Sequence, residues 1–174
     1  MSTDNNSAKY EQAQQTQVLV SALPANILGE VPDFDFLSLE CSTKDITFNR
    51  GQKQDVEVTT LGSKAQEFIN GLAAAGECTI GGNFVGSDEG QQVLERAYIN
   101  NEILEFRIIL PSGYGYAFLA EIRDMPLSIS VNSVVGVSFS LRIAKGAVKQ
   151  LTPETTRAAI AAAIPKDVTT KAVK

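Results

Sequence analysis

Residues 76–94 most constrain what this chain can fold into, because a half-buried strand passes there directly into a helix. Apolar side chains at Cys78, Ile80 and Phe84 alternate with polar ones over residues 77–84, which is typical of a strand with one buried face. Gly86 interrupts the alternation. The segment therefore predicts a strand that ends near residue 84 and is followed at once by another kind of element.

A short amphipathic helix is predicted over residues 87–100. Ser87 precedes it and is expected to cap its first amide groups. Asp88 and Glu89 would lie in the first turn, where negative charge is favourable beside the helix dipole. Four residues at helical spacing are expected to form the buried stripe: Val93, Leu94, Ala97 and Tyr98.

The rest of the central chain has the period-two alternation of β-strands. The clearest runs are residues 55–61, 104–110, 116–122 and 137–143. Residues 104–110 and 116–122 are separated by a Pro-Ser-Gly turn and predict a hairpin. Many closely spaced strands with one helix predict a mainly β fold, an antiparallel β-sandwich or partial barrel.

Length and composition suggest one domain with two extensions. The 174 residues fit an N-terminal arm (1–30), a β domain (31–150) and a C-terminal extension (151–174). The arm is polar and is expected either to be a flexible leader or to become ordered against a neighbouring subunit. No apolar run has the length of a membrane span, and the N-terminus lacks the pattern of a signal peptide. The sequence thus predicts synthesis in the cytoplasm and no membrane anchor.

Composition argues against an enzyme. The chain has no His and no Trp, which removes the commonest general base and metal ligand. It also lacks a phosphate-binding loop with Lys and the paired-Cys spacing of zinc sites. We therefore expect no catalytic residues, no metal and no cofactor. In a reducing cytosol, Cys41 and Cys78 are expected to be buried thiols rather than a disulfide.

The residues between 62 and 75 form a long stretch outside the strand pattern. Phe68, Ile69 and Leu72 are spaced there for one helical turn or a packed loop. A loop of this length in a compact domain is usually functional or mobile. Its apolar residues would be exposed on a monomer, so we interpret them as a contact surface rather than as core.

The run GECTIGGNF at residues 76–84, followed by Ser87-Asp88 and by GQQ at residues 90–92, resembles the tail tube proteins of long-tailed bacteriophages. The resemblance extends upstream to residues 55–62 and 67–72, and downstream to residues 106–113 and 137–143. It covers residues 34–151. It implies a structural virion protein whose six copies form a ring, with rings stacked into a tube through which the genome passes into the host.

This resemblance also implies partners and surfaces. The chain would bind itself, other tail proteins such as the tape measure, terminator and tail tip, and would let viral DNA pass without tight binding. Assembly would occur in the host cytoplasm. Phe68, Ile69 and Leu72 become candidates for contact with the next ring. Polar strand residues become candidates for the lumen, or else are ordinary solvated positions: Glu57, Thr59, Glu77, Thr79, Glu121 and Arg123.

The charge distribution agrees with a conduit for DNA. The net charge is −5; residues 145–174 carry six basic and two acidic side chains, which leaves −9 on the other 144 residues. Acidic walls repel phosphate groups, although screening limits the effect to about 8 Å at physiological salt. Mild repulsion is therefore expected rather than binding.

Two other classes of protein fit less well. A tube protein of a contractile tail or of a type VI-like injection machine would share the fold and the ring. A secreted β-sandwich adhesin would be expected to carry a signal peptide and often disulfides, and the sequence shows neither pattern.

Overall fold

A computed structural model describes residues 13–39 and 42–155, with the side chains of residues 145–147 left out. An eight-stranded antiparallel sheet runs in the order β2-β1-β7-β8-β10-β6-β3, and β9 pairs with one end of β10. Its strands are β1 (Gln17–Ser21), β2 (Phe36–Ser38), β3 (Thr43–Asn49), β6 (Glu77–Asn83), β7 (Ile103–Ile109), β8 (Gly115–Asp124), β9 (Leu127–Ser128) and β10 (Gly136–Leu151).

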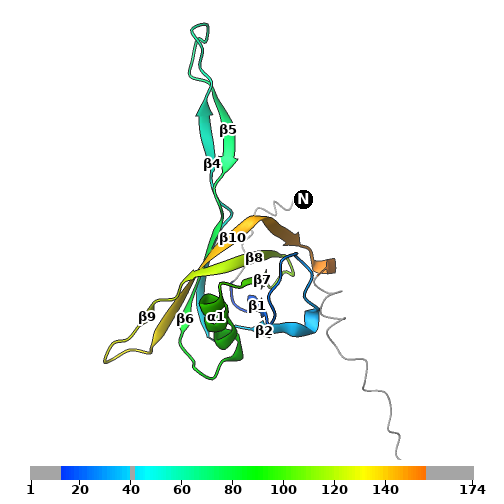
Figure 1. The fold of residues 1–174 in the computed structure, drawn as a ribbon, viewed down its shortest axis with the longest axis vertical. Coiled ribbons are helices and arrows are strands. Elements are labelled where there is room, and N and C mark those ends of the chain that lie inside the picture. The colour runs from blue at the N-terminus through cyan, green and yellow to red at the C-terminus, as the bar shows by residue number, and fades with distance from the viewer. Residues whose placement is uncertain (1–12, 40–41, 156–174) are drawn as a thin grey trace, which may run out of the picture.

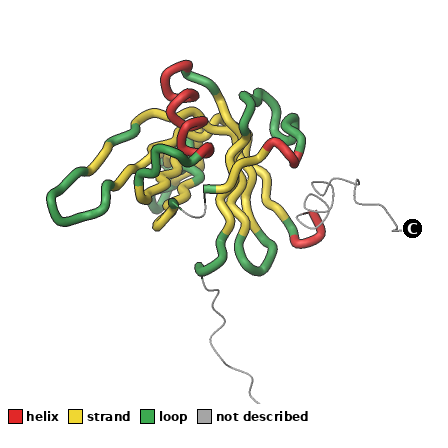
Figure 2. Tube along the Cα trace, turned by 90° about the horizontal axis from the view of Figure 1, so that it is seen from below, coloured by secondary structure: helices red, strands yellow, loops and turns green. Residues whose placement is uncertain are grey.

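The sheet curls around its own core (Figures 1 and 2). Buried apolar side chains from five of its strands form one cluster, which includes Val20, Phe106, Phe118, Leu141 and Ile80. The curl brings edge strand β3 against the middle of the sheet. The predicted fold, mainly antiparallel β with one short α-helix, is confirmed, and its architecture is a partial barrel.

The helix α1 (Glu89–Asn100) packs on β8 and β2. Its cap is Asp88 rather than the predicted Ser87: one carboxylate oxygen accepts hydrogen bonds from the backbone N–H groups of Gly90 and Gln91, at 2.9 and 3.2 Å. Gly90 lies so close to Leu39 that a Cβ would come within 2.6 Å of it. The helix can therefore sit tightly on the segment that joins β2 to β3.

The buried stripe of α1 differs in part from the predicted one. Leu94 and Ala97 are fully buried and Val93 is partly buried, as expected. Tyr98, however, is 41% exposed. Gln91 is buried in addition, because its side chain accepts a hydrogen bond from Val85 N–H and donates one to the Asn83 carbonyl. This buried amide fixes the strand–helix junction.

Phe84 lies beyond the end of β6 and is exposed, so its predicted place on the buried face is wrong. Its backbone N–H instead donates to the carbonyl of Val135, at 2.8 Å.

The connection from β1 to β2, residues 22–35, covers the outer face of β7 and β8. Ala25 and Val31 pack against Leu119 there, and Leu28 reaches Ile109. The outer face of the hairpin is consequently buried around Leu119 and Ile109. The hairpin itself was predicted correctly: Phe106 pairs with Phe118 at its centre.

The chain ends do not divide as the sequence suggests. Residues 17–21, assigned to the N-terminal arm, form β1 between β2 and β7. At the other end, residues 153–155 are helical. Residues 1–12 and 156–174 lie outside the described part of the chain, as does Cys41.

Candidate assembly surfaces

A two-stranded hairpin stands away from the barrel (Figure 1). It consists of β4 (Lys53–Glu57) and β5 (Phe68–Ala73), and we call residues 52–74 the long arm. At its base, Gly51 has a φ of +89°, and a Cβ there would meet the Ala74 carbonyl oxygen at 2.2 Å. At its tip, Ser63 donates to the Thr60 carbonyl, and its hydroxyl accepts from the Thr60 N–H. The arm is thus held in shape by local hydrogen bonds rather than by a hydrophobic core.

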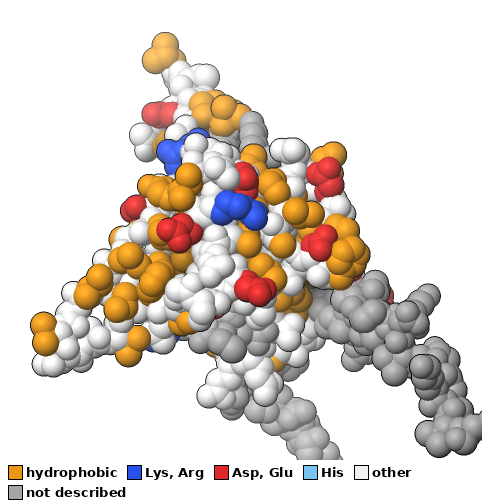
Figure 3. All heavy atoms as spheres, turned by 60° about the horizontal axis from the view of Figure 1, so that its bottom comes forward, with side chains coloured by type: hydrophobic (Ala, Val, Ile, Leu, Met, Phe, Trp, Pro, Cys, Tyr) orange, Lys and Arg blue, Asp and Glu red, His pale blue; other side chains and the backbone are white. Residues whose placement is uncertain are grey.

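The predicted contact residues all lie on this arm. Phe68, Ile69 and Leu72 belong to strand β5, so the expected helical turn or packed loop is wrong. Their exposure agrees with the sequence analysis: the three side chains are 55%, 55% and 77% exposed. Leu61 at the tip is fully exposed. Figure 3 shows the gathering of hydrophobic side chains on this projection.

Four of the six predicted lumen candidates lie together on the outer face of the barrel. Glu77 and Thr79 are on β6, and Glu121 and Arg123 are on β8. Strand β10 lies between them and adds Arg142, which pairs in register with both Glu77 and Glu121. Ion pairs join Glu121 to Arg123 at 3.3 Å and to Arg142 at 3.8 Å. We call these five residues the polar face.

The other two lumen candidates are elsewhere. Glu57 ends strand β4, and Thr59 follows it in the long arm, where its hydroxyl accepts a hydrogen bond from Glu67 N–H at 3.1 Å. The alternation that suggested a half-buried strand over residues 55–61 arises in a hairpin whose two faces are both exposed. The structure therefore does not place Glu57 and Thr59 on the polar face.

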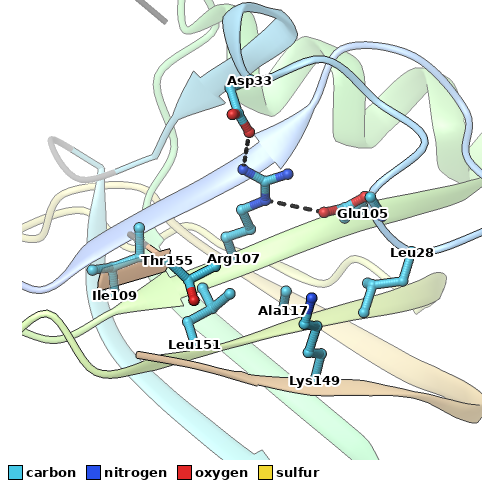
Figure 4. A pocket seen from close by; sticks show the side chains of 10 residues that line it. Leu28, Asp33, Glu105, Arg107, Ile109, Ala117, Lys149, Leu151 and Thr155 are labelled. Atoms are coloured by element: carbon cyan, nitrogen blue, oxygen red, sulfur yellow. Dashed lines mark hydrogen bonds and ion pairs between the residues drawn. The ribbon is translucent and has the colours of Figure 1, made fainter. Parts of the chain in front are cut away.

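A partly buried ion-pair cluster holds the connection of residues 22–35 against the sheet (Figure 4). Arg107 lies between Glu105 and Asp33, with Nε 3.0 Å from Glu105 Oε1 and Nη1 bonded to Asp33 Oδ1. Its guanidinium also stacks on the ring of Phe36, 3.9 Å from the centroid. Glu105 is buried and accepts from Gly29 N–H at 2.8 Å.

This cluster borders a cavity of about 350 Å³ that is also lined by Leu28, Lys149 and Leu151. Each charged oxygen named above has a partner, so the arrangement fixes the connection in place. The cluster could not be predicted from the sequence, because Glu105 and Arg107 alternate with apolar residues as solvated strand positions do.

Within the described residues, no group of three or more His, Cys, Asp or Glu side chains could hold a metal ion. Over the same residues, no helix combines the length and the apolar character needed to cross a membrane. Cys78 lies in the core, and burial raises the pKa of its thiol from 9.0 to about 12. It is thus a buried thiol, as predicted.

The architecture matches several solved structures. A chain from the tail of an empty gene transfer agent particle, determined with helical refinement and C6 symmetry, matches with a TM-score of 0.63 at 17% identity, over 82% of this chain and 99% of the other. The tail tube of SPP1 matches with a TM-score of 0.57 at 16% identity, over 82% and 78% of the two chains. This chain has the tail tube fold.

The tail tube fold also occurs in contractile systems. A sheath/tube terminator chain of an extracellular contractile injection system matches with a TM-score of 0.54 at 10% identity, over 84% of this chain and 100% of the other. No protein-family model and no curated protein sequence matches. The sequence resemblance to tail tube proteins is thereby confirmed at the level of the fold.

A second projection from the barrel was not predicted from the sequence. Strand β9 and the start of β10 form a short hairpin at one end of the barrel (Figure 1). Its apolar side chains are as exposed as those of the long arm. In the sequence, residues 127–131 have the pattern of an ordinary strand. Their side chains are exposed because most of the hairpin extends beyond the sheet.

Proposed function

We propose that this chain is a structural subunit of a phage tail tube, in which six copies form a ring and rings stack into a hollow conduit for DNA. The long arm carries the proposal. Phe68, Ile69, Leu72 and Leu61 are exposed on a hairpin that has no core of its own. Exposed apolar surface of this kind marks a site of association, and an arm that leaves the barrel can reach a copy in the next ring.

The open sheet supports a ring of copies. Strands β2 and β3 end the strand order and have no further strand partner within the described residues. Unpaired strand edges favour association with other chains. Lateral contact between neighbouring copies would cover these edges, as closure does in a barrel.

The polar face is our candidate for the wall of the lumen. It is built on β8, β10 and β6, and it presents Glu77, Thr79 and Glu121 beside Arg123 and Arg142. The two acidic and two basic side chains of this face balance in charge, so the face does not concentrate positive charge. Such a wall favours passage of DNA over binding.

A long flexible tail is the system that we favour, because the sequence motifs at residues 76–92 resemble that family. The contractile alternative has a specific observation in its favour, the match to a chain of an extracellular contractile injection system. In either case the partners would be further copies and other tail proteins, the location would be a virion or virion-like tail, and no enzymatic activity is proposed.

Assembly of the long-arm variant F68S/L72S tests this function. The wild-type chain is expected to form tubes in concentrated solution. The variant is expected to remain folded, since both side chains lie outside the core, and to fail to stack. The matched control is F34S, which removes another exposed phenyl ring (72% exposed) that lies away from the arm. Normal tubes from F68S/L72S would contradict the proposed role of the arm.

A further inference from the structure

The second projection, residues 127–136, is a separate contact device, and we call it the short arm. No charged residue occurs between positions 125 and 141, although one-fifth of the chain is charged. The exposed side chains of the short arm are Leu127 (48%), Ile129 (74%), Val131 (100%) and Val134 (66%). Figure 3 shows hydrophobic side chains gathered on this projection as well as on the long arm.

The short arm has a defined shape. Gly136 and Val137 pair with Ser128 and Leu127, and at the tip Ser133 N–H donates to the Ser130 carbonyl at 3.3 Å. The hydroxyl groups of Ser130 and Ser133 also bond to each other. At the base, the hydrogen bond from Phe84 to Val135 ties the arm to the end of β6. Phe84 and Val85 extend its apolar surface there, each about two-fifths exposed.

A recess of matching chemistry lies on the same chain. Between β1 and edge strand β3 there is a groove of about 600 Å³ whose apolar lining comes from Val18, Ile46, Phe48, Ile108, Leu110 and Tyr116. Strand β3 forms one wall, and its outer edge has no strand partner within the described residues. Among the described residues, the groove therefore offers an apolar floor beside a strand edge that has no strand partner.

We infer that the short arm inserts into the β1–β3 groove of the neighbouring copy in the same ring. This inference rests on the proposed function. A projection and a recess on different surfaces of one chain are what a head-to-tail contact requires, and such contacts form a ring when the rotation between copies closes. The occupant is a second copy because two chains of the same negative charge can approach closely through an uncharged segment.

The different directions of the two arms place the short-arm contact between neighbouring copies of the same ring. A stack of rings needs one contact along the axis and one around it. The two arms leave the barrel in different directions (Figure 1), and the proposed function already uses the long arm along the axis. Pairing of the short arm with the free edge of β3 would continue the sheet from one copy to the next.

The first test compares two serine variants. I129S/V131S/V134S changes the short arm, and F68S/L72S changes the long arm; all five side chains are exposed, so both variants are expected to fold. The short-arm variant should remain monomeric, whereas the long-arm variant should form single rings. Normal tubes from the short-arm variant would overturn the inference and leave the proposed function intact. A wild-type chain that stays monomeric would overturn both.

The second test is chemical cross-linking within tubes assembled from double-cysteine variants. Cysteine pairs are introduced as V131C/K44C, where Lys44 lies at the rim of the groove, and as V131C/E95C, where Glu95 is exposed on α1. A short bismaleimide should cross-link the first pair at least tenfold more than the second, in a ladder that ends at six chains. The wild-type chain controls for its own two cysteines.

Three outcomes would overturn the inference. A ladder that continues beyond six would place Val131 against the next ring. An intramolecular V131C/K44C cross-link, which migrates as a single chain, would mean that the short arm of the same copy occupies the groove. Equal cross-linking of V131C/E95C would show that Val131 has no fixed neighbour.

Discussion

The phenyl ring of Phe48 stacks on the phenol ring of Tyr116, with the ring centroids 5.3 Å apart and the planes 20° from parallel. Phe48 belongs to the edge strand β3, whereas Tyr116 belongs to β8 in the middle of the sheet. Phe48 also contacts Phe118, at 4.9 Å between centroids. This contact across the sheet holds the curl of the barrel and forms the floor of the β1–β3 groove.

Truncation of Phe48 should therefore weaken the barrel. Phe48→Ala removes two aromatic contacts and part of the core, and we expect it to lower the free energy of unfolding by about 3 kcal/mol. Urea unfolding followed by circular dichroism measures the change. Phe34→Ala is the control, because Phe34 is 72% exposed, and it should shift stability by less than about 0.5 kcal/mol. Equal effects of the two substitutions would contradict this account of the curl.

Arg107→Ala should be strongly destabilising. It removes the charge that compensates Glu105, whose side chain is 1% exposed, and breaking a buried ion pair costs about 3–5 kcal/mol. The control is Arg96→Ala, because Arg96 pairs with Glu102 while remaining 43% exposed; such surface pairs contribute less than about 1 kcal/mol. Thermal and urea unfolding compare the two variants. A loss for Arg107→Ala no larger than for Arg96→Ala would show that the cluster does not hold residues 22–35 in place.

Cys78 should make stability depend on alkaline pH. Burial raises the pKa of the folded-state thiol to about 12, from an ordinary value of 9.0. Below pH 9 both states keep the proton, so the group contributes no pH dependence. Between pH 9 and 12 the unfolded state loses the proton and the folded state keeps it. Stability is therefore lost as pH rises, by up to about 1.4 kcal/mol per pH unit.

The comparison with Cys78→Ala isolates this effect from other groups that titrate in the same range. The wild-type chain should lose stability more steeply than the variant above pH 9, as measured by urea midpoints. Parallel curves would mean that the thiol is not buried as the structure places it.

Charge on the polar face should control whether tubes bind DNA. Glu77→Lys reverses one exposed charge in every subunit, and Glu95→Lys does so on the outer surface of α1. If the polar face lines the lumen, short duplex DNA should co-sediment with Glu77→Lys tubes at 50 mM salt and be released at 200 mM, because phosphate binding weakens steeply with salt. The same behaviour from Glu95→Lys tubes, or none from Glu77→Lys tubes, would contradict this placement.

Sequence patterns predicted the elements that pack against the core. Alternation around Phe106 and Phe118 reflects burial on the core side of β7 and β8, and helical spacing at Leu94 and Ala97 reflects one buried stripe. These periodicities arise wherever an element has one face toward the core.

Such patterns could not predict contacts between residues far apart in the sequence, nor strands that have no buried face. Glu105 and Arg107 have the spacing of solvated positions, and residues 22–35, far away in the sequence, bury them. Phe68 and Ile69 are adjacent apolar residues in a hairpin exposed on both faces, so no alternation marked β5 as a strand. The polar face could be predicted from β6 and β8, whereas Arg142 required the register of β10.

Cryo-electron microscopy of the concentrated wild-type chain tests the central claim most directly. End-on views should show rings of six copies around an open channel, and side views should show these rings stacked, with the long arm crossing from one ring to the next. Dispersed single copies at every concentration, with β3 covered by the chain's own residues, would contradict the tail tube function.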